Sequence, residues 1–72
     1  ISNILIYPNP AKGMITIEGE YSSVDIYNIV GEIVLTSNYQ KHLDVTNLKE
    51  GVYFININIK GKLVTQKLVI NN

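Results

Sequence analysis

Apolar and polar side chains alternate along most of the chain with a period of two residues. In residues 14–18, for example, Ile15 and Ile17 fall on one face and Thr16 and Glu18 fall on the other. Successive side chains of a strand point to opposite faces of a sheet, so this pattern predicts half-buried strands. The pattern predicts strands over residues 4–7, 14–18, 22–28, 32–36, 41–45, 52–59 and 62–70, and no helix.

Turn-forming residues separate these segments. After the first strand comes Pro8-Asn9-Pro10, where each proline keeps the residue before it, Tyr7 or Asn9, extended. We interpret this segment as a bend from the first strand into the second, in preference to a contact with a partner. Asn28-Ile29-Val30-Gly31 predicts a tight hairpin with Gly31 in the left-handed conformation. Lys60-Gly61 predicts a second turn, before the last strand.

The corner before the longest predicted strand carries a further signal. Leu48, Gly51 and Tyr53 are spaced as in the tyrosine corner of immunoglobulin-like sandwiches, where a phenol bonds back to the preceding connection. Seven short antiparallel strands with hairpins and such a corner predict an all-β, immunoglobulin-like or fibronectin-like β-sandwich. A single closed barrel is the alternative. Gln66 falls on the otherwise apolar face of the last strand, which predicts a bulge or an exposed edge.

Composition limits the functions that the chain can have. Its 72 residues form one domain at most, and 46% hydrophobic residues can supply a core. The formal net charge is zero, so the chain lacks the excess of positive charge that attracts nucleic-acid phosphates. Every basic residue is a lysine, so no arginine can form the paired hydrogen bonds that recognise a phosphate or a guanine. No cysteine is present for a disulfide or a thiolate metal site, and the apolar runs are too short for membrane insertion. Because the chain begins at Ile1 and not at methionine, we expect it to be a piece of a longer precursor.

Groups that could support catalysis are few. His42 is the single histidine, and Asp44 lies on the same strand face. A catalytic triad would need a serine beside this pair, and no nucleophile-elbow motif is present. The serines considered are Ser2, Ser22, Ser23 and Ser37. The scattered carboxylates are Glu18, Glu20, Asp25, Glu32, Asp44 and Glu50. They lack the spacing of a calcium loop or the pairing of a glycosidase site, so we predict no catalytic, metal or cofactor site.

Exposed aromatic side chains leave a carbohydrate-binding module as an alternative. Tyr27 is predicted to face outward, and Tyr21 and Tyr39 fall in or near turns. No tryptophan is present, and we interpret each tyrosine as strand packing or as filling a turn, in preference to sugar binding. A spacer module without a ligand is a third alternative.

The order of motifs resembles a known family over nearly the whole chain, from Ile4 to Ile70. The motifs are Tyr7-Pro8-Asn9-Pro10 with Gly13, then Val24-Asp25-Ile26-Tyr27-Asn28 with Gly31 and Val34, then Leu43-Asp44-Val45-Thr46-Asn47-Leu48 running into Gly51-Val52-Tyr53-Phe54, and finally Lys67-Leu68-Val69-Ile70. Each motif is weak alone, but the ordered set at this spacing is specific. It resembles the C-terminal type A sorting domain of the type IX secretion system of the Bacteroidota.

This resemblance implies a role in sorting and no chemistry of its own. It implies a single domain, residues 1–72, at the C-terminus of a secreted precursor, with a cargo domain N-terminal to it. Its partners would be the type IX outer-membrane translocon, which recognises the folded tag, and a sortase-like surface peptidase, which removes it and attaches the cargo to lipopolysaccharide. The implied route is transit through the periplasm, then the cell surface or secretion. We expect the domain to act as a monomer without a cofactor.

The last hairpin, residues 51–70, is our candidate for recognition by the translocon, because the resemblance there is strong. The candidate residues are Lys60, Lys62, Lys67, Leu68, Val69 and Ile70. The lysines give this hairpin a positive rim that could meet an acidic partner. Lysines on an edge strand also prevent aggregation, which is the interpretation that we favour for Lys60 and Lys62, and both interpretations stay open for Lys67. The residues assigned to the structural motifs are Tyr7, Pro8, Asn9, Pro10, Gly31, Leu48, Gly51 and Tyr53.

Overall fold

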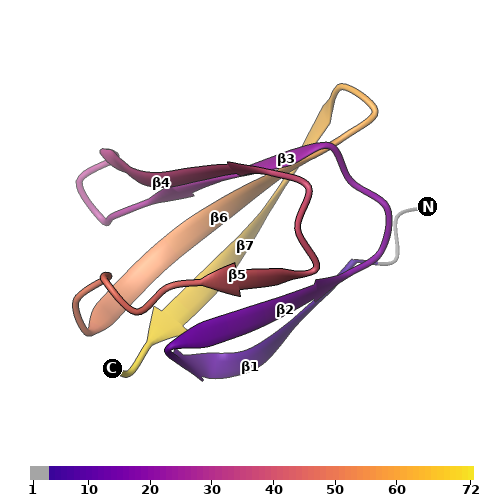
Figure 1. The fold of residues 1–72 in the computed structure, drawn as a ribbon. Coiled ribbons are helices and arrows are strands. Elements are labelled where there is room, and N and C mark those ends of the chain that lie inside the picture. The colour runs from indigo at the N-terminus through magenta and orange to yellow at the C-terminus, as the bar shows by residue number, and fades with distance from the viewer. Residues whose placement is uncertain (1–3) are drawn as a thin grey trace.

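The computed structural model describes residues 4–72, which fold into seven strands joined by short connections (Figure 1). The strands are β1 (Leu5–Lys12), β2 (Met14–Glu18), β3 (Ser23–Tyr27), β4 (Ile33–Asn38), β5 (His42–Asp44), β6 (Gly51–Ile59) and β7 (Lys62–Ile70). Each predicted strand is present, and apart from β1 the bounds agree to within two residues.

The strands pack in two layers (Figure 1). One layer has the order β1-β2-β5 and the other the order β4-β3-β6-β7, with antiparallel pairing within each layer. A single parallel contact, Ala11 opposite Ile70, links β1 to β7 and so connects the layers. This arrangement confirms the predicted β-sandwich and has the immunoglobulin-like order of strands. It also excludes the closed barrel, because β4 and β5 lie at opposite ends of the strand order and are not paired in the described chain.

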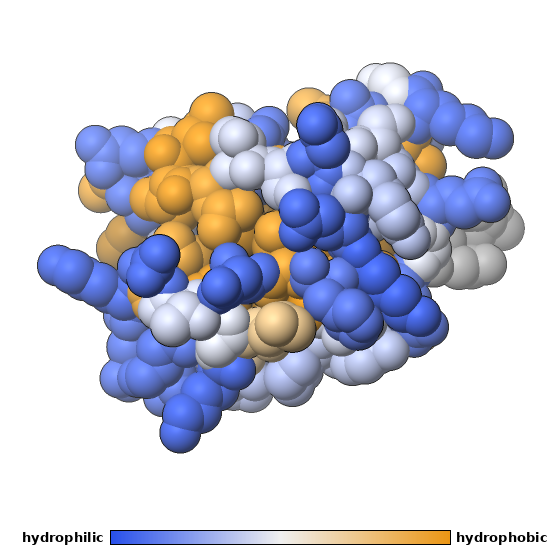
Figure 2. All heavy atoms as spheres, viewed as in Figure 1, coloured by the Kyte–Doolittle hydropathy of each residue, from blue (hydrophilic) through white to orange (hydrophobic). Residues whose placement is uncertain are grey.

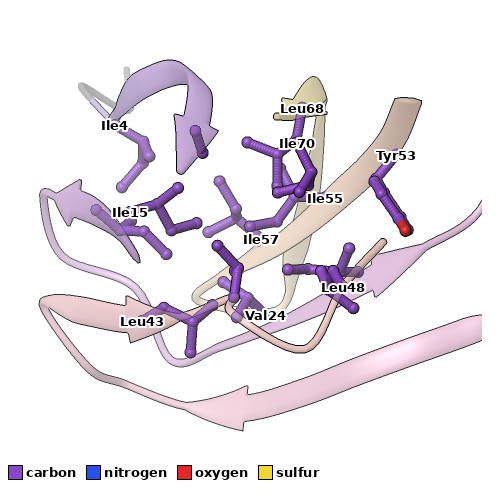
Figure 3. Close-up of a cluster of buried hydrophobic side chains, with 14 of the residues drawn as sticks. Ile4, Ile15, Val24, Leu43, Leu48, Tyr53, Ile55, Ile57, Leu68 and Ile70 are labelled. Atoms are coloured by element: carbon purple, nitrogen blue, oxygen red, sulfur yellow. The ribbon is translucent and has the colours of Figure 1, made fainter. Parts of the chain in front are cut away.

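The inner faces of the two layers enclose a hydrophobic core (Figure 3). The alternation of apolar and polar residues predicted the core side chains of these strands correctly: Ile15 and Ile17 of β2 and Ile55 and Ile57 of β6 are completely buried. Burying such a side chain stabilises a fold by about 1.5–3 kcal/mol. The buried residues are Ile4, Ala11, Ile15, Ile17, Tyr21, Val24, Ile26, Leu43, Val45, Leu48, Tyr53, Ile55, Ile57, Leu68 and Ile70.

The first strand differs from the prediction. It was expected to end at Tyr7, but β1 continues through both prolines to Lys12. Because proline has no backbone N–H to donate to a neighbouring strand, the pairing of β1 with β2 is interrupted between Tyr7 and Lys12. Along this interruption the chain crosses towards β7, where Ala11 lies opposite Ile70. The Pro8-Asn9-Pro10 segment is therefore a part of the strand that changes sheets, and not only a bend before β2.

The two hairpins form as expected. Gly31 has a φ of 90°, a conformation that favours glycine, and the Oδ1 atom of Asn28 accepts hydrogen bonds from the amides of Val30 and Glu32 at 3.0 and 2.9 Å. Between β6 and β7, Lys60 and Gly61 both have positive φ values, 53° and 84°. Two central residues with positive φ define the type I′ turn, whose twist matches that of antiparallel strands.

The tyrosine corner and the position of Gln66 are also settled. The hydroxyl of Tyr53 donates a hydrogen bond of 2.7 Å to the carbonyl of Lys49, which confirms the corner. The register between β6 and β7 is continuous, so the expected bulge is not present at Gln66. Within residues 4–72, β1 pairs with β7 at Ile70 alone, so in this part of the chain residues 62–66 of β7 form an exposed edge, which was the alternative expectation.

Candidate recognition surface

The β6–β7 hairpin carries three lysines and no acidic residue between Gly51 and Ile70. Lys60 and Lys62 lie at its tip, and Lys67 lies on β7; all three are exposed. The tip is held by the Oδ1 atom of Asn58, which accepts a hydrogen bond of 2.8 Å from the amide of Gly61. The hairpin therefore presents a net charge of +3 from positions that the strand register fixes.

The alternation along β7 divides the residues proposed for recognition. Leu68 and Ile70 are completely buried in the core, whereas Lys67 is exposed and Val69 is half-buried on the opposite face. Leu68 and Ile70 therefore do not offer their side chains to a partner of the folded domain. Lys60, Lys62, Lys67 and Val69 remain on its surface.

Apolar side chains of β3 and β6 accompany Lys67 and Val69 on this outer face. Phe54 pairs with Lys67 and also with Tyr27 of β3, and Val52 pairs with Val69. Phe54 is 40% exposed and Val52 is 37% exposed, which is unusual for such large apolar residues in the middle of a sheet. We name Tyr27, Val52, Phe54, Lys67 and Val69 the outer strip. The sequence contained a signal for it, because β6 is apolar on both faces near its start.

The side chain of Asn9 fastens β1 to the backbone of this strip. Its Nδ2 atom donates to the carbonyl of Lys67 and its Oδ1 atom accepts from the amide of Val69, both at 3.0 Å. This pair of bonds imitates the pairing of a neighbouring strand at the point where the prolines prevent one. The sequence pattern predicted only a structural place for Asn9 in a bend, and this contact was not predicted.

The groups considered for catalysis lie on the outer face of the other layer. The Nδ1 atom of His42 is 3.1 Å from the Oγ1 atom of Thr16, its neighbour on β2. Asp44 accepts a hydrogen bond of 2.8 Å from the amide of Thr46, and the side chain and amide of Thr46 lower the pKa of its carboxyl group. Of the serines considered, Ser37 lies on β4, in the other layer, and Ser2 lies outside the described residues. Asp44 thus holds a turn, and His42 contacts a threonine.

The remaining polar contacts are also structural in character. Tyr7 donates a hydrogen bond of 2.6 Å to Glu18, and this bond raises the pKa of the tyrosine. Lys41 lies 4.0 Å from the same carboxylate. In residues 4–72 no three of the histidine, aspartate and glutamate side chains come together as metal ligands would. The same residues contain no helix of the length and apolarity that a membrane span requires.

The aromatic side chains do not form one platform. Tyr21 is buried, and its hydroxyl both donates to the carbonyl of Gln40 and accepts from the amide of that residue. The ring of Tyr39 lies against it, with centroids 4.9 Å apart, and is itself 53% exposed. Tyr27 lies on the outer strip, next to Phe54. Burial raises the pKa of Tyr21, as expected for a phenol that fills a gap between strands.

These features define a class of protein: a small immunoglobulin-like β-sandwich that exposes lysines and apolar side chains on its last hairpin. The sequence matches the family of secretion system C-terminal sorting domains over residues 5–71, and the chain belongs to this family. It is a C-terminal sorting domain of type IX secretion, so its role is export to the cell surface or secretion. No curated protein sequence matches the chain.

Proposed function

We propose that the translocon of type IX secretion recognises this domain, in its folded form, through Lys60, Lys62 and the outer strip. The observation that carries this proposal is that one hairpin without acidic residues exposes three lysines, Lys60 and Lys62 at its tip and Lys67 five residues further along β7. Asn9 and the type I′ turn hold these lysines on a rigid sheet, so a partner meets them in a fixed arrangement. An acidic surface with an apolar centre would be complementary to them.

The wider pathway completes this proposal. The domain follows a cargo domain in the precursor, passes through the periplasm and has no catalytic activity of its own. A sortase-like peptidase then removes it at the cell surface and anchors the cargo. The family supports this route, and the contacts of His42 and Asp44 support a domain without a reactive centre.

A secretion assay tests the recognition surface. The chain is fused to the C-terminus of a periplasmic reporter in a cell that is competent for type IX secretion, and the reporter outside the cell is measured. We expect Lys67→Glu to lower secretion strongly, and a combined Lys60→Glu and Lys62→Glu variant to do the same. Lys49→Glu, which lies in the corner outside this surface, is the matched control and should secrete normally.

Each variant is also purified and unfolded in urea, so that loss of recognition is separated from loss of the fold. Normal secretion of all the charge-reversed hairpin variants would contradict the proposal. Deletion of the whole domain without effect would favour a spacer module. Binding in a glycan titration that is lost in Tyr27→Ala would favour the carbohydrate-binding alternative.

A further inference from the structure

The β-sandwich has unpaired strand edges, and they are not protected equally. β4 and β5 are the two ends of the strand order. β5 has three residues, and its exposed side chains are His42 and Asp44, with Lys41 just before them. Short and charged edge strands resist pairing with another chain. β4 has six residues, from Ile33 to Asn38, and contains neither a charge nor a proline.

The exposed part of the β7 edge is protected in other ways. Near its C-terminal end, the amide group of Asn9 occupies the backbone of Lys67 and Val69. Near its N-terminal end, the edge carries Lys62, and lysine is the residue most used to prevent strand addition. Within residues 4–72, β4 is therefore the long edge that has no charge and no side chain of another strand bound to its backbone; its own Ser37 hydroxyl donates to the carbonyl of Asn38 at 2.8 Å, at the end of the strand.

Exposed apolar residues surround this edge. Ile29 and Val30 of the β3–β4 turn are each 74% exposed, and Ile33 and Val34 of β4 are 53% and 39% exposed. Figure 2 shows hydrophobic side chains gathered near the start of β4 and towards β5, whereas the far part of β4 is hydrophilic. Small soluble domains rarely leave such residues together on the surface unless another molecule covers them.

The far half of β4 lies beside an acidic hollow. A β-bulge disturbs the ladder between Ile33 and Leu35, where Tyr27 and Ile26 are the partners, and beyond it the pairing of residues 35–38 is regular. A hollow of about 310 Å³ lies along this regular part and is lined by Ser23, Val24, Asp25, Thr36, Ser37 and Asn38.

The charge of this region is wholly acidic. Asp25 and Glu32 are the charged residues between positions 22 and 38, and no lysine is among them. Glu32 already accepts a hydrogen bond of 2.8 Å from Asn28, and the ion pair found in residues 4–72 joins Lys41 to Glu18 instead. Asp25 thus lines the hollow beside the open edge, and among residues 4–72 no cationic side chain forms an ion pair with it.

We infer that β4 binds an extended segment of a partner protein, which adds as a further strand along residues 35–38 and places a Lys or Arg side chain in the hollow against Asp25. Main-chain hydrogen bonds to the free edge of β4 supply affinity, and the basic side chain supplies specificity. Apolar side chains of the segment cover Ile33 and Val34. This surface lies at the opposite end of the sheet from β7, and the inference does not depend on the proposed role of the lysines.

Titration of the isotope-labelled chain with a synthetic peptide tests this inference by NMR. The probe is a blocked peptide of about eight residues, the usual length of a strand, that alternates Val and Thr and has one central Arg. A second peptide with Glu in place of Arg is its control. We expect the amide shifts of residues 33–38 to change with the Arg peptide, and Asp25→Asn to weaken this binding about threefold, as for an exposed ion pair.

Two further variants locate the contact. Thr36 pairs with Asp25 across the ladder, so Thr36→Lys places a cation both on the edge and at the carboxylate and should reduce binding more than Asp25→Asn. Met14→Lys, on β2 in the other layer, should leave it unchanged. The inference would be overturned if the amide chemical shifts of β4 did not change on titration, or if the Arg and Glu peptides bound equally well. A concentration-dependent dimer in sedimentation that Thr36→Lys abolishes would also overturn it, because the occupant would then be a second copy of the chain.

Discussion

Replacing Asn9 with alanine should destabilise the domain by about 1–3 kcal/mol. The variant loses two hydrogen bonds, to the carbonyl of Lys67 and from the amide of Val69, and each contributes about 0.5–1.5 kcal/mol. A chain of this length has a free energy of unfolding of about 4–11 kcal/mol, so the loss is a large fraction of the total. The melting temperature should fall by about 4–8 °C for each kcal/mol.

Urea unfolding followed by circular dichroism measures this loss, and hydrogen exchange of the Val69 amide shows where it arises. Asn71→Ala is the matched control, because the side chain of Asn71 makes no hydrogen bond in residues 4–72; it should change the free energy of unfolding by less than about 0.5 kcal/mol. Asn9→Ala with wild-type stability and a Val69 amide that is still protected would show that the side chain of Asn9 does not hold β1 on β7.

Three further predictions concern stability and its dependence on pH. Tyr53→Phe should lower the free energy of unfolding by about 1 kcal/mol in urea titrations, because the carbonyl of Lys49 loses its partner; an unchanged midpoint would contradict the corner. Asn72→Ala should cost about 1–2 kcal/mol by the same assay, since its side chain donates to the carbonyls of Val45 and Leu48 at 2.9 and 2.7 Å. Asp44 has a lowered pKa in the folded chain, so its stabilising contribution is complete above the unfolded pKa, near 3.8, and is lost as the pH falls through the lower folded value. In Asp44→Asn the free energy of unfolding should therefore fall less as the pH is lowered through this range. The same fall in the variant and the wild type would refute the assignment.

The features that sequence analysis predicted correctly depend on local patterns. Alternation over a few residues was enough to place Ile15, Ile17 and Ile57 in the core, because a strand with one buried face leaves few other registers. The link from Tyr53 to Lys49 spans four residues and was recognised from its spacing. The course of β1 was missed because it depends on Asn9 and Lys67, which are 58 residues apart, and no periodicity connects them.

The candidate surface shows the same division. The alternation of apolar and polar residues placed Leu68 and Ile70 on the core face of β7. They were nevertheless included in the proposed recognition site with Lys67, because the family resemblance covers consecutive residues of this strand. Burial separates the two groups, because Leu68 and Ile70 are completely buried. The alternation along β6 places Phe54 on the face opposite the buried Ile55 and Ile57, but how far its side chain is covered there depends on the packing of the neighbouring strands, which the strand itself does not show.

Because one strand serves both the core and the candidate surface, deleting residues 62–72 cannot identify the recognition signal. The deletion removes Leu68 and Ile70 from the core as well as Lys67 from the surface, and losing two large buried side chains costs about 4–10 kcal/mol, comparable with the whole stability of the domain. Secretion would then be lost through unfolding, whether or not the lysine is recognised. Lys67→Glu changes an exposed side chain and leaves the core intact, so a loss of secretion at unchanged stability would locate the signal on the surface.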